Sequence, residues 1–170
     1  MQAAAEEVRS ESVGGVHELE GKYLTFALGK EEYGIGILKV REIIGLMEIT
    51  AVPHTPSYIK GVINLRGRVI PVLDLRLKFE METEAYTERT CIIVVEVQGE
   101  SAAVQVGMLV DSVSEVLNVS GQEIEPPPAF GGSTETAFIL GMAKIKGDVK
   151  ILLDADRIIG TGELAGFEAM

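Results

Sequence analysis

Short runs of apolar residues, separated by turns that contain glycine, recur along this chain. The order of run, turn and run appears twice, at residues 22–37 and at residues 91–109. Apolar runs of this length between turn signals predict β-strands. The chain has 19 glycines in 170 residues, above the average share of about 7%, and many tight turns would require them. The pattern therefore predicts a protein built of short strands and tight hairpins.

The chain also repeats itself once. Residues 58–74 align without a gap on residues 138–154, and residues 40–44 resemble residues 113–117 more weakly. The matched pairs include Gly61 and Gly141, Arg66 and Lys146, Gly67 and Gly147, and Asp74 and Asp154. An internal repeat of this size indicates two related structural units.

Each half of the repeat, roughly residues 20–85 and 88–160, contains about five expected strands. Five short, twisted strands bury a core best by curling into a small barrel, which also limits open sheet edges. The sequence therefore predicts an all-β protein with minor helix, in which two small barrels pack side by side.

Helix is expected in two short places, at residues 55–59 after a pair of prolines and at residues 154–159. The ends of the chain, residues 1–18 and 163–170, have the character of flexible tails. We expect the folded domain to span residues 19–162.

The net charge of the chain limits the classes of molecule that it is expected to bind. It carries 26 Asp and Glu against 15 Lys and Arg, a formal net charge of −11. Such a surface repels nucleic acid and anionic lipid, so a protein partner with basic patches is favoured. No apolar stretch approaches the ~18 residues of a spanning helix, and residues 1–18 do not resemble a secretory signal. Cys91 has no second cysteine to pair with, which agrees with a reducing cytoplasm.

The side chains that enzymes and metal sites need are scarce. The two histidines are His17 in the N-terminal segment and His54 between two prolines, too few for a metal cluster or a Ser-His-Asp arrangement. One catalytic alternative pairs Asp74 with Asp154, because aspartic proteases bring together two carboxylates that share a proton. The residues after each Asp are not the small hydroxyl residue and glycine of those enzymes, so each Asp more simply ends a strand and caps the next turn. The sequence favours a non-enzymatic protein without a cofactor or metal.

One segment resembles a known family. Pro-Ser-Tyr-Ile-Lys-Gly-Val-Ile-Asn-Leu-Arg-Gly at residues 56–67, with residues 69–76 after it, resembles the signature of the CheW-like family of bacterial chemotaxis. Residues 32–43 and 110–117 fit the same family, and the resemblance covers about residues 20–160. It implies two intertwined five-stranded SH3-like β-barrels, with exchange of strands between the barrels left open. It also implies a non-enzymatic adaptor that couples methyl-accepting chemotaxis receptors to the histidine kinase CheA.

The resemblance further implies a receptor-binding groove between the barrels, which holds the helical hairpin of the receptor tip. The matching positions are Val40, Glu42, Gly61, Arg66, Val113 and Val116. An amphipathic helix requires apolar side chains in such a groove and polar ones at its rim. Core packing is the alternative role for the valines. A solvated hairpin tip or an ion pair with Glu42 is the alternative for Arg66.

Contacts with the regulatory domain of the kinase are implied at the outer ends of the barrels. The matching positions are Ile43, Leu46, Lys60 and Phe130. Phe130 follows a stiff triple proline, which suits a binding hot spot. Glu125 stands where close relatives tend to carry a basic residue, and this departure weakens or reverses the electrostatic contribution expected there.

The expected assembly follows from the two ends of the duplicated molecule. A protein with two similar but unequal ends can bridge two kinase regulatory domains of the same fold, and head-to-tail contacts of this kind close into rings. We expect a monomer when free, located in the cytoplasm, which joins such rings beneath receptor clusters. The alternative is a generic SH3-like peptide-binding module, or a CheW-like domain of a related signalling adaptor. The absence of Trp argues against a groove for proline-rich peptides.

Overall fold

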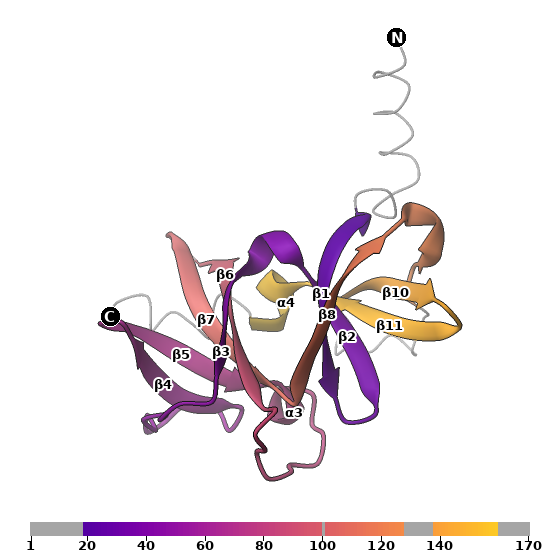
Figure 1. The fold of residues 1–170 in the computed structure, drawn as a ribbon. Coiled ribbons are helices and arrows are strands. Elements are labelled where there is room, and N and C mark those ends of the chain that lie inside the picture. Colours follow the sequence, from indigo (N-terminus) through magenta and orange to yellow (C-terminus); the bar gives the residue numbers. More distant parts are fainter. Residues whose placement is uncertain (1–18, 100, 128–137, 160–170) are drawn as a thin grey trace.

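The computed structural model describes residues 19–99, 101–127 and 138–159, which fold into two β-sheets lying side by side (Figure 1). The strands are β1 (Gly21–Leu28), β2 (Glu31–Gly36), β3 (Val40–Gly45), β4 (Ile59–Leu65), β5 (Arg68–Asp74), β6 (Cys91–Gln98), β7 (Ala103–Val110), β8 (Ser112–Val119), β9 (Ile124–Glu125), β10 (Ile139–Ile145) and β11 (Asp148–Leu153). The short helices are η1 (Ile37–Lys39), α3 (Leu75–Lys78), η2 (Gly121–Glu123) and α4 (Ala155–Ile159).

The two sheets exchange hairpins between the halves of the repeat. One sheet has the order β8-β1-β2-β11-β10-β9 and the other the order β3-β6-β7-β5-β4. Hairpin β1–β2 therefore joins the sheet of the second half, and hairpin β6–β7 joins that of the first. The repeat in the sequence at residues 20–85 and 88–160 therefore does not coincide with the sheets, and the sequence had left such an exchange of strands open.

The predicted fold class is confirmed: the protein is all-β with minor helix and forms two intertwined SH3-like barrels. One sheet has the expected five strands, and the other has six because the two-residue strand β9 pairs with β10.

Three clusters of buried apolar side chains hold the barrels together. One cluster lies within the β3–β7 sheet and another within the sheet of β1, β2 and β8–β11. The third draws Phe26 and Leu28 from β1 together with Ile93 and Val95 from β6. Since this central cluster takes residues from both sheets, neither barrel can bury its core without the other.

The hairpin turns at matching places in the repeat have the same geometry. Arg66 and Gly67 have φ of 53° and 87°, and Lys146 and Gly147 have φ of 53° and 86°. Positive φ at both central residues defines the turn that suits two-residue hairpins. These turns confirm the hairpins predicted at both places.

The two repeated aspartates begin short helices. Asp74 Oδ1 accepts a hydrogen bond from the N–H of Arg76 at 2.9 Å, and Asp154 Oδ1 accepts one from the N–H of Asp156 at 3.0 Å. The predicted capping role is confirmed, and so is the helix at residues 154–159, where α4 forms. The helix expected at residues 55–59 is wrong: a turn there leads directly into β4. Helix α3, which follows Asp74, was not predicted. Among the described residues, no helix has the length and apolarity that would let it cross a membrane.

Candidate binding surfaces

Four of the predicted receptor-binding residues lie on two edge strands. Val40 and Glu42 belong to β3 and Val113 and Val116 belong to β8, and each of these strands is the outermost of its sheet. The two strands occupy matching places in the repeat. An edge strand exposes backbone groups and one row of side chains, so a partner can reach both strands.

The three valines differ in exposure. Val40 and Val113 are half-buried and pack against the central core cluster. Val116 is 49% exposed. The core-packing alternative therefore applies in part to Val40 and Val113, whereas Val116 presents an apolar side chain to solvent.

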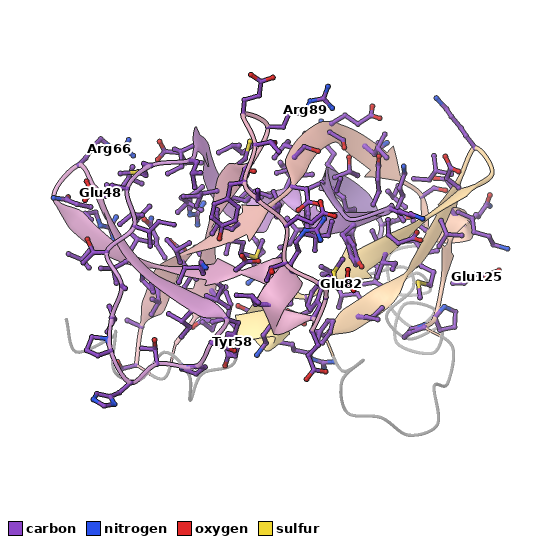
Figure 2. All side chains as sticks on the ribbon, turned by 90° about the horizontal axis from the view of Figure 1, so that it is seen from below. Glu48, Tyr58, Arg66, Glu82, Arg89 and Glu125 are labelled. Atoms are coloured by element: carbon purple, nitrogen blue, oxygen red, sulfur yellow. The ribbon has the colours of Figure 1, made fainter. Side chains whose placement is uncertain are left out.

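Glu42 and Arg66 form a two-pronged ion pair. Arg66 Nη1 donates to Glu42 Oε2 at 3.0 Å, and Nη2 donates to Oε1 at 2.5 Å. The hydrogen bonds from Arg66 lower the pKa of Glu42 below its ordinary value. The pair joins edge strand β3 to the tip of the β4–β5 hairpin, at the opposite edge of the same sheet. The predicted ion pair is confirmed. The Arg66 side chain remains 69% exposed, so it is also available to a partner (Figure 2).

Gly61 has a local structural role. It is buried with φ of 145°, and a Cβ at this position would lie 2.0 Å from the carbonyl oxygen of Thr50. Its neighbour Val62 exchanges two backbone hydrogen bonds with Thr50, each of 2.8 Å. Only glycine lets the chain after β3 approach β4 this closely. A contact between Gly61 and a receptor stays a prediction.

Two of the predicted kinase-binding residues lie together. Leu46 and Lys60 line one shallow hollow with Met47, Ile49 and Tyr86. Ile43, on β3, is 44% exposed and is not part of this hollow. Phe130 lies outside the described residues.

Tyr86 is a surface residue that the sequence did not single out. It is 40% exposed and belongs to the loop between α3 and β6. It is the one aromatic residue in the mostly polar stretch 80–90, and a lone aromatic side chain there was the signal that could have marked it.

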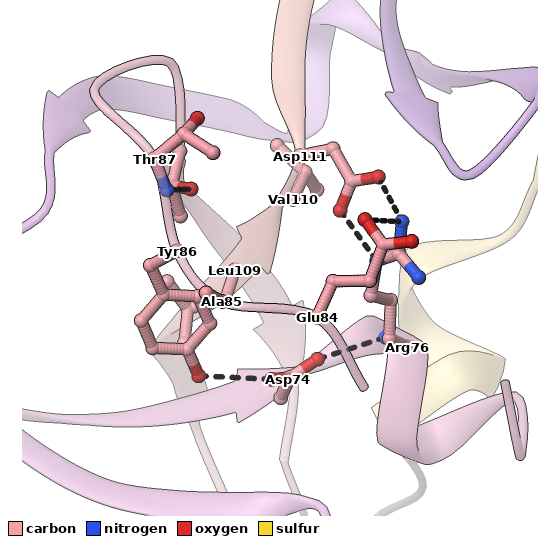
Figure 3. A pocket seen from close by; sticks show the side chains of 10 residues that line it. Asp74, Arg76, Glu84, Ala85, Tyr86, Thr87, Leu109, Val110 and Asp111 are labelled. Carbon is pink, nitrogen blue, oxygen red and sulfur yellow. Dashed lines mark hydrogen bonds and ion pairs between the residues drawn. The ribbon is translucent and has the colours of Figure 1, made fainter. Parts of the chain in front are cut away.

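The polar groups near Tyr86 pair with one another (Figure 3). Tyr86 donates its hydroxyl hydrogen to Asp74 Oδ2 at 2.9 Å. Arg76 donates to both carboxylate oxygens of Asp111, at 2.7 and 2.5 Å. Burial favours a higher pKa for Asp111, but the hydrogen bonds from Arg76 and from the N–H of Gly29 outweigh it and hold the pKa below its ordinary value. This network ties a loop, a helix and a strand end together.

The fold and these surfaces define a double SH3-like barrel whose candidate sites are surfaces for binding other proteins. The chain belongs to the CheW-like domain family, whose model matches residues 22–163.

Similar proteins agree with this membership. The chain is 40% identical over 144 residues to the chemotaxis protein CheW of Klebsiella aerogenes, covering 85% of this chain and 84% of that protein. It is 37% identical over 140 residues to the chemotaxis protein CheW of Rhizobium meliloti, covering 82% and 88% of the two chains. Among solved structures it is similar to the scaffolding protein TtCheW of Thermoanaerobacter tengcongensis, with a TM-score of 0.74, 35% identity and coverage of 85% of this chain and 96% of that one.

The resemblance inferred from residues 56–76 is thus confirmed. Membership of this family also confirms the prediction that the chain is not an enzyme.

Proposed function

We propose that this chain is a chemotaxis adaptor that couples the cytoplasmic tip of methyl-accepting receptors to the regulatory domain of the histidine kinase CheA. The observation that carries the proposal is its similarity, over 85% of its length, to a chemotaxis protein and to a scaffolding protein. In this role the chain works in the cytoplasm and is recruited to receptor clusters at the membrane.

The receptor tip is proposed to contact edge strands β3 and β8. Val116 on β8 offers exposed apolar surface. Val40 on β3 and Val113 on β8 are half-buried and pack against the central core cluster. The Glu42–Arg66 pair supplies charge beside them. An amphipathic helix binds where apolar side chains are bordered by polar ones. This chemistry supports the proposal. Gly61, the remaining proposed receptor contact, lies on β4, where it allows the close approach of Thr50.

The kinase is proposed to dock on exposed residues of β3 and of the segment that follows it. Ile43 and Leu46 are 44% and 42% exposed, and Lys60 adds a positive charge beside Leu46. Phe130 is the proposed contact at the other end of the molecule. Two unequal ends would let the free monomer alternate with kinase domains in a closed ring.

Titration calorimetry tests the proposal in two parts. The full chain is titrated with the regulatory domain of the kinase from the same cell, and separately with a fragment of the receptor tip. Saturable binding to both, surviving moderate salt, is expected. Failure of both titrations at high micromolar concentrations, together with binding to a proline-rich peptide, would favour a generic SH3-like module instead.

A further inference from the structure

The ladder between strands β1 and β8 contains a β-bulge. Its register shifts between Leu24 and Phe26, so that Thr25 alone stands opposite two residues of β8, Ser114 and Glu115. The extra residue belongs to β8, which is the edge strand of its sheet. Because a bulge redirects the side chains that follow it, this one determines which face of β8 each side chain occupies.

The bulge places Val113 and Val116 on the same face of β8. Val113 lies opposite Phe26, and Val116 lies opposite Leu24. Residues directly opposite in an antiparallel pair share a face of the sheet, and Leu24 and Phe26 both belong to the central core cluster. In a regular strand, residues three positions apart point to opposite faces. Without the bulge, one of the two valines would therefore leave this face.

The side chain of Thr25 holds the bulge in place. Its hydroxyl donates to the carbonyl oxygen of Glu115 at 2.9 Å and accepts from the N–H of Glu115 at 3.2 Å. One side chain therefore binds both backbone groups of a residue in the bulge. Thr25 is 1% exposed, and a hydroxyl buried to this degree is costly unless it is hydrogen-bonded.

The matching bulge in the other sheet is held differently. The ladder between β3 and β6 shifts between Val40 and Glu42, at the same place in the repeat, and Glu42 pairs there with Val94. Val94 thus stands where Thr25 stands in the ladder of β8. Since valine has no hydroxyl, a barrel of this kind forms its bulge without one, which indicates that the hydroxyl of Thr25 serves β8 in particular.

We propose that Thr25 is a positioning residue for receptor binding, which acts by holding the bulge that turns Val113 and Val116 to one face of β8. This inference rests on the proposed function and adds a buried residue that itself touches no partner. A contact surface that is fixed before binding loses less freedom when the partner arrives. Loss of the hydroxyl lets β8 shift toward a regular register, and this lowers the fraction of molecules that present both valines.

The test is titration of the full chain against the receptor-tip fragment, and separately against the regulatory domain of the kinase. Thr25→Val keeps the branched shape and removes the hydroxyl, and it is expected to weaken receptor binding about three- to tenfold. Thr25→Ser keeps the hydroxyl and removes a buried methyl group. It should bind the receptor tip within about twofold of the unaltered chain, although its melting temperature falls. Kinase affinity should stay within about twofold for both variants, because Ile43 and Lys60, two of the proposed kinase contacts, belong to the other sheet.

Hydrogen exchange of the Glu115 amide reports on the bulge directly. Its rate in the free chain should rise in Thr25→Val and stay unaltered in Thr25→Ser. A general loss of stability would not produce this pattern, because it would raise the exchange rates of both variants in proportion to their instability.

Thr90→Val is the matched control. Thr90 is also a buried threonine, 6% exposed, and its hydroxyl accepts a hydrogen bond from the N–H of Thr87 at 2.8 Å. It directly precedes β6, a strand of the other sheet, so its substitution should leave receptor affinity unchanged. If Thr25→Val fails to fold, as judged by its melting curve, Thr25→Ser and Thr25→Ala decide the outcome, because these two variants differ only in the hydroxyl.

Three results would contradict the inference. Unaltered receptor affinity in folded Thr25→Val would restrict Thr25 to folding, while the proposed function stood. Losses of affinity that followed the melting temperature, in Thr25→Ser as much as in Thr25→Val, would also show a purely structural role. Absence of receptor binding by the unaltered chain would contradict the proposed function itself.

Discussion

Asp111 and Asp156 each accept a hydrogen bond from a backbone N–H beside the turn of a matching hairpin of the repeat. Asp111 accepts from Gly29, which follows β1, at 2.8 Å, and Asp156 accepts from Gln98, at the end of β6, at 2.9 Å. Each aspartate also pairs with a basic side chain where the chain passes between the two sheets. Asp111 stands at the passage from β7 to β8 and pairs with Arg76 of α3. Asp156 stands in α4 and pairs with Lys39 at the passage from β2 to β3. The two ion pairs therefore occupy equivalent positions in the repeat, with the acidic and the basic residue interchanged.

The two ion pairs differ in burial, which predicts unequal contributions to stability. The side chain of Arg76 is 11% exposed and that of Lys39 is 40% exposed. Arg76→Ala leaves the partly buried carboxylate of Asp111 without its main partner and is expected to lower the free energy of unfolding by about 1–3 kcal/mol. Lys39→Ala should cost about 0–1 kcal/mol, as exposed pairs do. Urea unfolding of both variants measures the difference, and equal losses would contradict this assignment.

The Arg76–Asp111 pair also predicts a dependence on pH. The pKa of Asp111 in the folded protein lies below its ordinary value of 3.8. Its contribution to stability is therefore complete above that value and is lost as the pH falls through the lower pKa of the folded state. The stability gap between the unaltered chain and Arg76→Ala should be largest near neutral pH and narrow below pH ~4. A gap that widened on acidification, in urea unfolding at a series of pH values, would show that the sign is wrong.

Gly61 is expected to tolerate no side chain. Gly61→Ala places a methyl group 2.0 Å from the carbonyl oxygen of Thr50, so the chain after β3 must move away from β4. We expect a loss of about 2–4 kcal/mol in the free energy of unfolding. Gly36→Ala is the control, because nothing lies within 4 Å of a Cβ at that position. Similar melting temperatures for the two variants would mean that β4 does not need this close approach.

Arg66 is expected to matter for binding and little for folding. Its side chain is 69% exposed, and exposed ion pairs add little to stability. Arg66→Ala should leave the melting transition almost unchanged and weaken binding to the receptor-tip fragment. Glu42→Gln removes the charge opposite Arg66 but keeps the Arg66 side chain. If Arg66 contacts the receptor directly, this variant should weaken receptor binding less than Arg66→Ala does. A large loss of stability with unaltered receptor affinity would make Arg66 a structural residue.

Local features of this fold could be predicted from the sequence, whereas its long-range pairings could not. Arg66-Gly67 and Lys146-Gly147 indicated hairpins because a glycine between two short apolar runs is typical of a tight turn that joins neighbouring strands. Exchange of strands had been left open, but the sequence did not say which hairpins exchange, because residues 22–28 and 91–97 are both apolar strands of one repeat. Each of these two strands could pair with strands of either sheet, so only the packing in three dimensions determines which sheet it joins.

The residues of the candidate surfaces, too, were predictable from the sequence only in part. The Glu42–Arg66 pair was foreseen as one alternative, because opposite charges lay in segments that the family brings together. Tyr86 was missed because its contacts are with Asp74 and Lys60, which are 12 and 26 residues away in the sequence. A single aromatic residue in a polar loop carries no periodic pattern that would mark it.

The most direct test of the coupling role is the mass of the complex formed when the chain, the kinase regulatory domain and the receptor-tip fragment are mixed. Sedimentation velocity at a series of concentrations measures it. A single boundary heavier than either binary complex, containing all three components, is the result that the proposed function predicts. Two binary complexes that exclude each other would contradict it, because an adaptor that couples two partners must hold both at once.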